Sequence, residues 1–343
     1  MLNRYGRSVV PAAIVAAVLG SSACAGTSSF SAVSHDGAQS MRVQRPQTAT
    51  ADQCSTKACI YVTDRYVNQI TVYTKGAHGN VAPLRNITGA STGLNEPIGI
   101  ALDSSRAVHV ANFTASSITV YAPNSNGNVA PTITISGSKT KMNGPVFVAL
   151  DSSGKSYVVN FYGASVEVFA AGASGNVAPT KVIAGSKTLL FEPLSTVVDA
   201  SKRIFVTNYA ASSVLVFAPG ANGNVAPIRS ISGSNTGLNG PGGLALDSAG
   251  NIYVTNYNAN SVEEFASNAN GNVAPIRTIA GSNTGLNVPT EIAFDSGKNI
   301  YITNRDANSV NVYAANATGN VAPTRTIVGS KTLLASPAGM ALR

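Results

Sequence analysis

Short apolar runs alternate with turns of small and polar residues along almost the whole chain. Residues 98–102, 108–112, 118–121 and 132–135 are four such runs, rich in the β-branched and aromatic residues typical of strands. Asp-Ser, Asn and Gly residues separate them, as turn residues do. The pattern predicts four antiparallel strands, which we name inner, second, third and outer in chain order.

The same pattern recurs every 48 residues. Its clearest marker, Gly-Asn-Val-Ala-Pro, occurs six times without any insertion between copies: Gly79–Pro83, Gly127–Pro131, Gly175–Pro179, Gly223–Pro227, Gly271–Pro275 and Gly319–Pro323. A period in the forties built from short strands is typical of a β-propeller blade. The sequence therefore predicts an all-β, six-bladed β-propeller over residues 56–343, with four strands per blade.

The two ends of the repeat region are offset by one strand. The region begins with a second strand at residues 60–64 and finishes with an inner strand at 339–342. We expect this C-terminal inner strand to join the N-terminal three strands in one blade. Such closure removes the open sheet edges that would otherwise promote aggregation.

Two further rows of residues follow the period. A Lys or Arg occupies one outer-strand position in five blades, and a proline precedes each outer strand; we interpret both as protection of an exposed edge, with Gly-Asn forming the turn. The cations are Arg85, Lys181, Arg229, Arg277 and Arg325. A large aromatic residue ends the third strand of each blade, and we expect these residues to pack between blades. They are Tyr73, Tyr121, Phe169, Phe217, Phe265 and Tyr313.

The first 25 residues have the features of an export signal. Arg4 and Arg7 precede an apolar run at residues 8–20, and small residues follow at 21–25. The apolar run is too short to span a bilayer, so we expect no transmembrane helix in the mature chain. Two outcomes stay open: cleavage after Ala25, or lipidation of Cys24. Either one predicts a periplasmic, cell-surface or secreted protein, lipid-anchored in the second case.

Residues 26–55 are rich in Ser, Ala, Gln and Thr and lack a hydrophobic period, which predicts a flexible tether. Cys54 and Cys59 lie at its end, five residues apart. In an oxidising compartment they are candidates for a disulfide, and the alternative is two buried thiols.

Composition excludes several classes of function. Only 11% of residues are charged, the net charge is +8, and no run of Lys and Arg suits a phosphate backbone, so nucleic-acid binding is not expected. The chain has three histidines, His35, His78 and His109, and none has the neighbours that a multi-histidine zinc site needs. A Ser-His-Asp triad is equally disfavoured. We expect a monomer.

One face of the predicted propeller carries the ends of the second strands and the beginnings of the inner strands. The second strands end there at Asp64, Asn112, Asn160, Asn208, Asn256 and Asn304. Glu96, Glu192 and the deeper Glu291 begin the inner strands. Glu96, Glu192, Asn208 and Asn256 form a candidate Ca²⁺ site in the central channel, because oxygen ligands suit this ion. The alternative is that the ring caps the adjoining turns, which its presence in every blade favours.

Aromatic and basic residues lie in the turns of the same face. They are Arg65, Tyr66, Phe113, Phe161, Tyr162, Tyr209, Tyr257 and Arg305. Such side chains can form a platform for a protein, peptide or glycan, or they can pack beneath the turns.

Second strands read Tyr-Val-Thr-Asn at residues 253–256 and Tyr-Ile-Thr-Asn at 301–304, and inner strands read Pro-Ile-Gly-Ile-Ala-Leu-Asp at 97–103. These elements resemble NHL-repeat propellers and the YVTN repeat of bacterial surface propellers. The resemblance implies ligand or partner binding on one face or, in fewer members, metal-dependent hydrolase, lactonase or lyase activity. The Glu and Asn set is also similar to the metal site of gluconolactonase-type propellers.

We therefore predict an exported, non-catalytic propeller that serves as a binding scaffold at the bacterial cell envelope. The alternative is a lactonase or other hydrolase that depends on a divalent metal bound by Glu96, Glu192 and neighbouring Asn.

Overall fold

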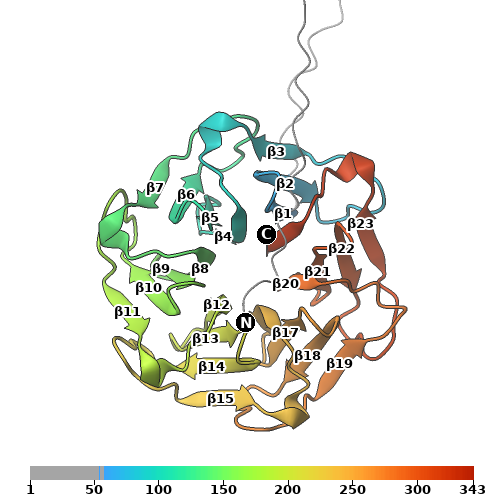
Figure 1. Cartoon of the computed structure of the whole chain (residues 1–343). Helices are drawn as coiled ribbons and strands as arrows, with labels where there is room; N and C mark the ends of the chain where they lie inside the picture. The colour runs from blue at the N-terminus through green and yellow to red at the C-terminus, as the bar shows by residue number, and fades with distance from the viewer. Residues whose placement is uncertain (1–53, 55–57) are drawn as a thin grey trace, which may run out of the picture. The chain divides into compact units, whose positions relative to one another are not determined.

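The computed structural model describes Cys54 and residues 58–343, which form six four-stranded antiparallel sheets arranged in a ring (Figure 1). Each sheet is one blade, with its inner strand nearest the central axis and its outer strand at the rim. The predicted all-β, six-bladed fold is confirmed. Within the part of the chain that the structure describes, no helix is long and apolar enough to cross a membrane.

The bounds of the elements follow the 48-residue period. The inner strands of blades 1 to 6 are β24 (Pro337–Leu342), β4 (Pro97–Leu102), β8 (Pro145–Leu150), β12 (Pro193–Val198), β16 (Pro241–Leu246) and β20 (Pro289–Phe294). The second strands are β1 (Cys59–Asp64), β5 (Val108–Asn112), β9 (Ser156–Asn160), β13 (Ile204–Asn208), β17 (Ile252–Asn256) and β21 (Ile300–Asn304). The third strands are β2 (Gln69–Thr74), β6 (Ser117–Tyr121), β10 (Ser165–Phe169), β14 (Ser213–Phe217), β18 (Ser261–Phe265) and β22 (Ser309–Tyr313). The outer strands are β3 (Arg85–Thr88), β7 (Ile133–Ser136), β11 (Lys181–Ala184), β15 (Arg229–Ser232), β19 (Arg277–Ala280) and β23 (Arg325–Val328). Short 3₁₀ turns follow five of the outer strands: η1 (Ala90–Thr92), η2 (Ser138–Thr140), η3 (Ser186–Thr188), η4 (Ser234–Thr236) and η5 (Ser330–Thr332).

Blade 1 closes the ring as predicted. Its strand order is β24-β1-β2-β3, and Ile60 of β1 pairs with Leu342 of β24. The backbone of Cys59 also exchanges two hydrogen bonds with Arg343, at 2.5 and 3.0 Å. Cys54 and Cys59 form a disulfide with a Cα–Cα distance of 5.6 Å, so Cys54 is tied to β1 of the closing blade. The predicted signal segment and most of the predicted tether lie outside the described residues.

The core lies between blades. Each of the six apolar clusters contains residues from two neighbouring blades. Tyr73 of β2, only 1% exposed, shares a cluster with Val310 and Ile327 of blade 6. All six aromatics that end the third strands are buried in this way, so their predicted packing between blades is confirmed. Burial of such a side chain contributes roughly 1.5–3 kcal/mol to stability.

A threonine ties each inner strand to its neighbour in four blades. The inner strands contain a bulge, and in blade 4 the hydroxyl of Thr207 accepts the freed N–H of Ser195 at 2.9 Å. The same hydroxyl donates to the carbonyl oxygen of Gly242 in blade 5, at 2.7 Å. Thr63, Thr255 and Thr303 make equivalent pairs of bonds. Because buried polar groups need partners, this role explains the threonine of the Tyr-Val-Thr-Asn element.

Gly-Asn-Val-Ala-Pro joins neighbouring blades. The backbone of Gly127, in blade 2, exchanges hydrogen bonds with Asn86 O and Thr88 N of β3 in blade 1, at 2.8 and 3.2 Å. The side chain of Asn128 accepts the N–H of Ser91 in η1, at 2.7 Å. All six copies make this clasp, including the one that closes the ring. The motif is therefore more than the predicted turn, because it pairs with the outer strand of the preceding blade.

The row of outer-strand cations likewise connects blades, which corrects its interpretation as edge protection. Arg85 is 8% exposed, and its guanidinium donates to the Tyr61 hydroxyl of its own blade and to Asn124 of blade 2. Arg325 donates in the same way to the Tyr301 hydroxyl and to the carbonyl oxygen of Lys75 in blade 1. The sequence pattern misled because a cation on an edge strand and a cation reaching across a blade junction occupy the same register position.

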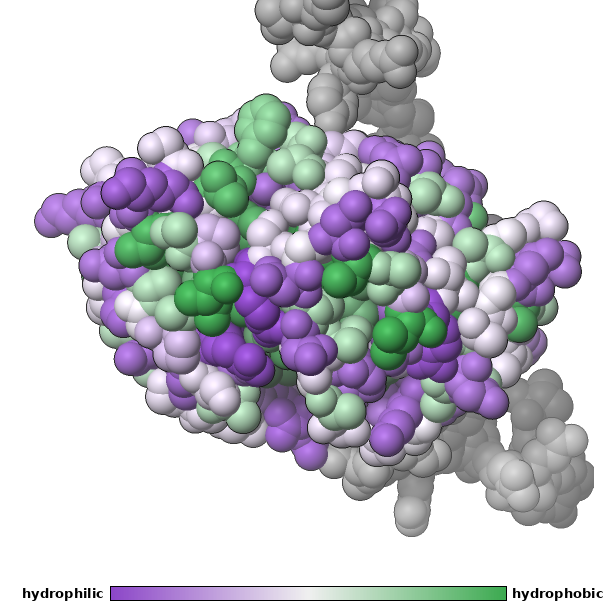
Figure 2. Space-filling view, turned by 90° about the horizontal axis from the view of Figure 1, so that it is seen from below, coloured by the Kyte–Doolittle hydropathy of each residue, from purple (hydrophilic) through white to green (hydrophobic). Residues whose placement is uncertain are grey.

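Figure 2 views the rim from the side where β15 and β19 lie in Figure 1. Hydrophobic residues there form separate green areas between hydrophilic ones. The exposed apolar residues next to these two outer strands are Ile228 (52%) and Ile276 (60%), one in each blade. Isolated apolar residues of this kind are ordinary on a protein surface.

Deletion of residues 338–343 should prevent ring closure, because it removes most of β24 and leaves β1 without its inner partner. The exposed edge and opened core should make the protein insoluble. Soluble expression and thermal melting test this expectation. Soluble protein with an unchanged melting curve would contradict it.

Replacement of one clasp side chain should weaken a single blade junction. Asn176→Ala removes the acceptor for the N–H of Lys139 and should lower the free energy of unfolding by about 1 kcal/mol. Ser174→Ala, an exposed position two residues earlier, is the matched control and should have no effect. Equal denaturant midpoints for the two variants would show that the clasp does not stabilise the ring.

Candidate ligand-binding face

The asparagine face is the side of the ring where the second strands end at Asp64, Asn112, Asn160, Asn208, Asn256 and Asn304. These six side chains are at most 1% exposed. Each has an oxygen that accepts a backbone N–H from the loop leading into the inner strand of its blade. Asn208, for example, accepts the N–H of Phe191 at 2.6 Å. In this structure the ring caps the loops, as side chains of this kind do beside turns.

The predicted calcium ligands do not fit a resident cation. The amide oxygen of Asn208 is occupied by Phe191, and its NH₂ group donates to Leu189 O at 2.8 Å. Asn256 is engaged similarly, through Asn239 N and Ser261 Oγ. Among the described residues, no three His, Cys, Asp or Glu side chains are grouped as a metal site requires. A Ca²⁺ ion here would have to displace bonds that hold the loops.

The three predicted glutamates belong to blades 2, 4 and 6 and are not brought together. Glu96 forms an ion pair with Arg65 of blade 1, at 2.8 Å. Glu192 is half-buried, and no described residue forms a hydrogen bond or ion pair with its carboxylate. Glu291 lies within β20 and is 4% exposed; burial raises the pKa of its carboxyl to about 8, although hydrogen bonds from backbone N–H groups oppose the shift.

The predicted aromatic and basic residues do gather on this face, in two clusters. The first contains Phe113, Phe161 and Tyr162, with ring centroids 5.2 to 6.3 Å apart, and the guanidinium of Arg65 lies 4.9 Å from the Phe113 ring. Such edge-on packing and cation–π contact are favourable geometries.

The second cluster contains Tyr209, Tyr257 and Arg305. The two tyrosine rings lie 5.8 Å apart at 89°, and the guanidinium of Arg305 lies 4.6 Å from the Tyr257 ring. Asp306 accepts a hydrogen bond from Arg305 at 2.8 Å. Four of the rings and Arg305 are half-buried, whereas Tyr162 and the neighbouring Tyr66 are 65% and 60% exposed. The half-buried rings are those of Phe113, Phe161, Tyr209 and Tyr257. The predicted alternative of packing beneath the turns therefore describes only part of the set.

Two apolar residues beside these clusters were not predicted. Leu189 and Phe191 are 56% and 59% exposed in the loop that contains Glu192. Other blades have Gly, Lys or Leu at the first position and Asn or Ala at the second. A column-by-column comparison of the repeats would have revealed both residues as interruptions of the pattern.

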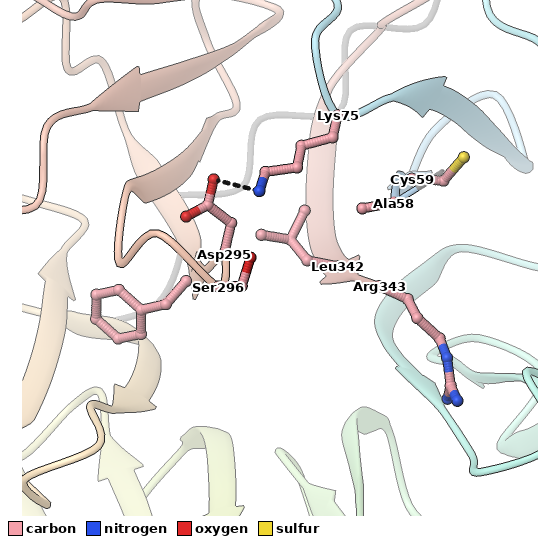
Figure 3. Close-up of a pocket in the computed structure, with 8 residues that line it drawn as sticks. Ala58, Cys59, Lys75, Asp295, Ser296, Leu342 and Arg343 are labelled. Atoms are coloured by element: carbon pink, nitrogen blue, oxygen red, sulfur yellow. Dashed lines mark ion pairs between the residues drawn. The ribbon is translucent and has the colours of Figure 1, made fainter. Parts of the chain in front are cut away.

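The opposite face has a cavity of about 230 Å³ at the closing junction (Figure 3). Lys75 and Asp295 point toward each other there and form an ion pair at 3.0 Å, beside Leu342 and Cys59. Burial raises the pKa of Asp295, but hydrogen bonds from Asn299 and Lys75 outweigh it and lower the pKa to about 2. These contacts join blade 6 to blade 1 and indicate a structural role.

Fold and site together define a six-bladed propeller with an aromatic, arginine-bearing face. The sequence matches the family described as lactonase, 7-bladed beta-propeller over residues 42–334, and the chain belongs to this family. This member has six blades where the family description gives seven. The more specific resemblance to NHL and YVTN repeats stays a prediction. No curated protein matches the sequence.

Solved structures share the fold at low sequence identity. A nidogen/laminin complex contains a chain with 17% identity and a TM-score of 0.61, over 83% of this chain and 98% of that one. A putative 6-phosphogluconolactonase from Bacteroides uniformis has 16% identity and a TM-score of 0.55, over 84% and 99%. A streptogramin B lyase has 12% identity and a TM-score of 0.55, over 81% and 82%. These similarities show the propeller fold alone.

Asp64 is the one acid in the asparagine ring, and it should make stability depend on pH. Burial raises its pKa from 3.8 to about 7, although hydrogen bonds from Ala335, Gln69 and Thr71 oppose the shift. Between these values the folded protein retains a proton that the unfolded chain releases, so the free energy of unfolding falls as pH rises. Asp64→Asn should therefore be more stable than the wild type at pH 8, by at most about 4 kcal/mol.

Urea unfolding at pH 4 and pH 8 measures this effect. The difference between Asp64→Asn and wild type should fall to about 0.5 kcal/mol at pH 4, where folded Asp64 is neutral and the unfolded residue is only partly ionised. Asp306→Asn, at an exposed position, is the control and should show no comparable change with pH. A difference of equal size at both pH values would mean that ionisation of Asp64 is not its cause.

Proposed function

We propose that this protein is a non-catalytic propeller that binds a protein, peptide or glycan on its asparagine face. The observation that carries the proposal is the pair of aromatic clusters, each combined with an arginine and each partly open to solvent. Aromatic rings with an adjacent guanidinium offer apolar area and directed hydrogen bonds at little cost in side-chain entropy.

The polar groups of the same face support binding over catalysis. The side-chain oxygens of the asparagine ring accept N–H groups from the loops. The carboxylate of Glu96 accepts hydrogen bonds from Arg65, and Glu291 is buried within β20. A general acid or base must reach the proton that it transfers. The asparagines and Glu291 are buried, and the carboxylate of Glu96, 32% exposed, is held by Arg65. The face presents aromatic rings, the half-buried Glu192 and the Arg305–Asp306 pair to solvent.

Export to the cell envelope is part of the proposal. It rests on the charged, apolar and small-residue segments of residues 1–25 and on Cys24, all of which lie outside the described residues. The Cys54–Cys59 disulfide supports it, because disulfides persist in oxidising compartments.

Screening on peptide and glycan arrays, followed by a double variant, tests the binding function. Tyr209→Ala with Tyr257→Ala removes one aromatic cluster and should weaken binding of an array ligand at least tenfold, because anchor residues of this kind contribute 2 kcal/mol or more. Ile228→Ala with Ile276→Ala, on the rim, is the matched control and should bind normally. Equal binding by both double variants would exclude the aromatic face as the binding site.

Lactone hydrolysis is the second candidate function, and the family match favours it. Among the predicted glutamates, Glu192 is the one whose carboxylate no described residue pairs, so it is the candidate for proton transfer to a lactone. Hydrolysis of a panel of lactones by the wild type, abolished in Glu192→Gln, would favour this function over simple binding. The rate should not respond to calcium, since Glu96, Asn208 and Asn256 are engaged by other residues.

A further inference from the structure

The first aromatic cluster contains a complete binding site for a guanidinium group. Arg65 fills this site. Its Nη2 and Nε atoms donate to Glu96 at 2.8 and 3.2 Å, and its guanidinium carbon lies 4.9 Å from the Phe113 ring and 5.2 Å from the Tyr66 ring. One carboxylate and two rings therefore surround the cation, a combination that attracts guanidinium groups strongly.

The three partners of Arg65 recur two repeats of 48 residues further along the chain. Tyr162, Glu192 and Tyr209 occupy the positions of Tyr66, Glu96 and Phe113. At the position of Arg65 itself, the chain has Phe161. In sequence, the second copy thus keeps the carboxylate and both rings, and phenylalanine replaces the cation. In the structure, the ring of Tyr162 packs against Phe113 of the first cluster.

The backbone holds the two glutamates in the same way. Both have a left-handed conformation, with φ of 49° at Glu96 and 52° at Glu192. The carbonyl oxygen of Glu96 accepts the N–H of Phe113 at 3.0 Å, and that of Glu192 accepts the N–H of Tyr209 at 3.2 Å. Blades 3 and 5 have glycine at the equivalent position, and a non-glycine residue there costs roughly 1 kcal/mol. The shared conformation indicates that the side chains of Glu96 and Glu192 leave the backbone in the same direction relative to their own blades.

Phe161 occupies the register position of the missing cation but carries no charge. Its ring packs against Phe113 and Tyr162, at 6.3 and 5.3 Å, and Tyr209 packs against Tyr257 on the other side. The ring of Phe161 therefore packs within the first cluster and that of Tyr209 within the second, and Glu192 lies between these two residues in the sequence. Among the described residues, none neutralises its carboxylate.

We propose that Glu192, with Tyr209 beside it, binds an arginine side chain of a protein or peptide partner. This inference rests on the proposed binding function and specifies the chemistry of its ligand. The partner's guanidinium occupies the position that Arg65 has in the first copy. Leu189 and Phe191, exposed in the same loop, contact an apolar residue next to that arginine.

Binding of a short peptide with the sequence Leu-Arg, blocked at both ends, tests the proposal by NMR or calorimetry. The matched probe replaces arginine by citrulline, which keeps the planar shape but is neutral and has a carbonyl oxygen, an acceptor, in place of one NH₂ donor. The arginine peptide should bind at least tenfold more tightly, since a charge-assisted bond to a carboxylate is worth roughly tenfold or more. Equal affinity of the two peptides, or no binding of the arginine peptide, would overturn the proposal.

Two variants and a matched control locate the site. Glu192→Gln should weaken the arginine peptide at least tenfold, whereas Glu96→Gln should leave its affinity unchanged, because Arg65 already occupies that carboxylate. Phe161→Arg supplies the missing cation from within the chain and should abolish peptide binding. Unchanged affinity in Glu192→Gln or in Phe161→Arg would refute the assignment.

The array ligands separate this inference from the proposed function. Loss of an array ligand in the Tyr209 and Tyr257 double variant, with full retention in Glu192→Gln, would leave the binding face in place and overturn the arginine site. Retention in both variants would overturn both.

Discussion

Packing of each blade against its two neighbours is the constraint on which this structure depends. A single four-stranded sheet cannot bury its apolar faces, and the six core clusters each lie at a junction between two blades. Closure through β24 is therefore essential, because the last blade has no other way to cover the core that it shares with the first. The backbone bonds between Cys59 and Arg343 hold the C-terminal strand in blade 1, and the disulfide ties Cys54 to β1 of the same blade.

The polar residues of the repeat serve that packing. The threonine of the second strand satisfies the bulge of one inner strand and bonds the next, the motif asparagine caps the 3₁₀ turn of the preceding blade, and the outer-strand arginines reach neighbouring carbonyl groups. Polar residues that recur from blade to blade therefore have a structural role in holding the ring together. The residues available for function are those that interrupt the repeat.

Glu96 and Glu192 occupy the same position of the repeat but differ in their surroundings. The two residues share a backbone conformation and occupy equivalent loops, yet Glu96 is neutralised by Arg65, whereas no described residue pairs with Glu192. The difference arises from a single position, occupied by arginine in blade 1 and phenylalanine in blade 3. The ion pair joins blades 1 and 2, and the described residues form no equivalent ion pair between blades 3 and 4.

The sequence by itself determined the number of blades, the bounds of the strands it placed to within two residues, the closing strand and the buried aromatic rows, because each follows from the 48-residue period. It also placed Arg65, Phe113, Tyr209 and Tyr257 on one face. It misjudged the outer-strand arginines, because their hydrogen-bond partners in the next blade lie about 40 residues away. It left the asparagine ring between two roles, because the loop N–H groups that it caps lie 17 residues away and follow no local pattern. Only the tertiary structure decided that the asparagines cap loops, that Glu291 is enclosed, and that no cation of the described residues pairs with Glu192. Charge and burial at these positions are set by neighbouring blades, which only the closed ring brings into contact.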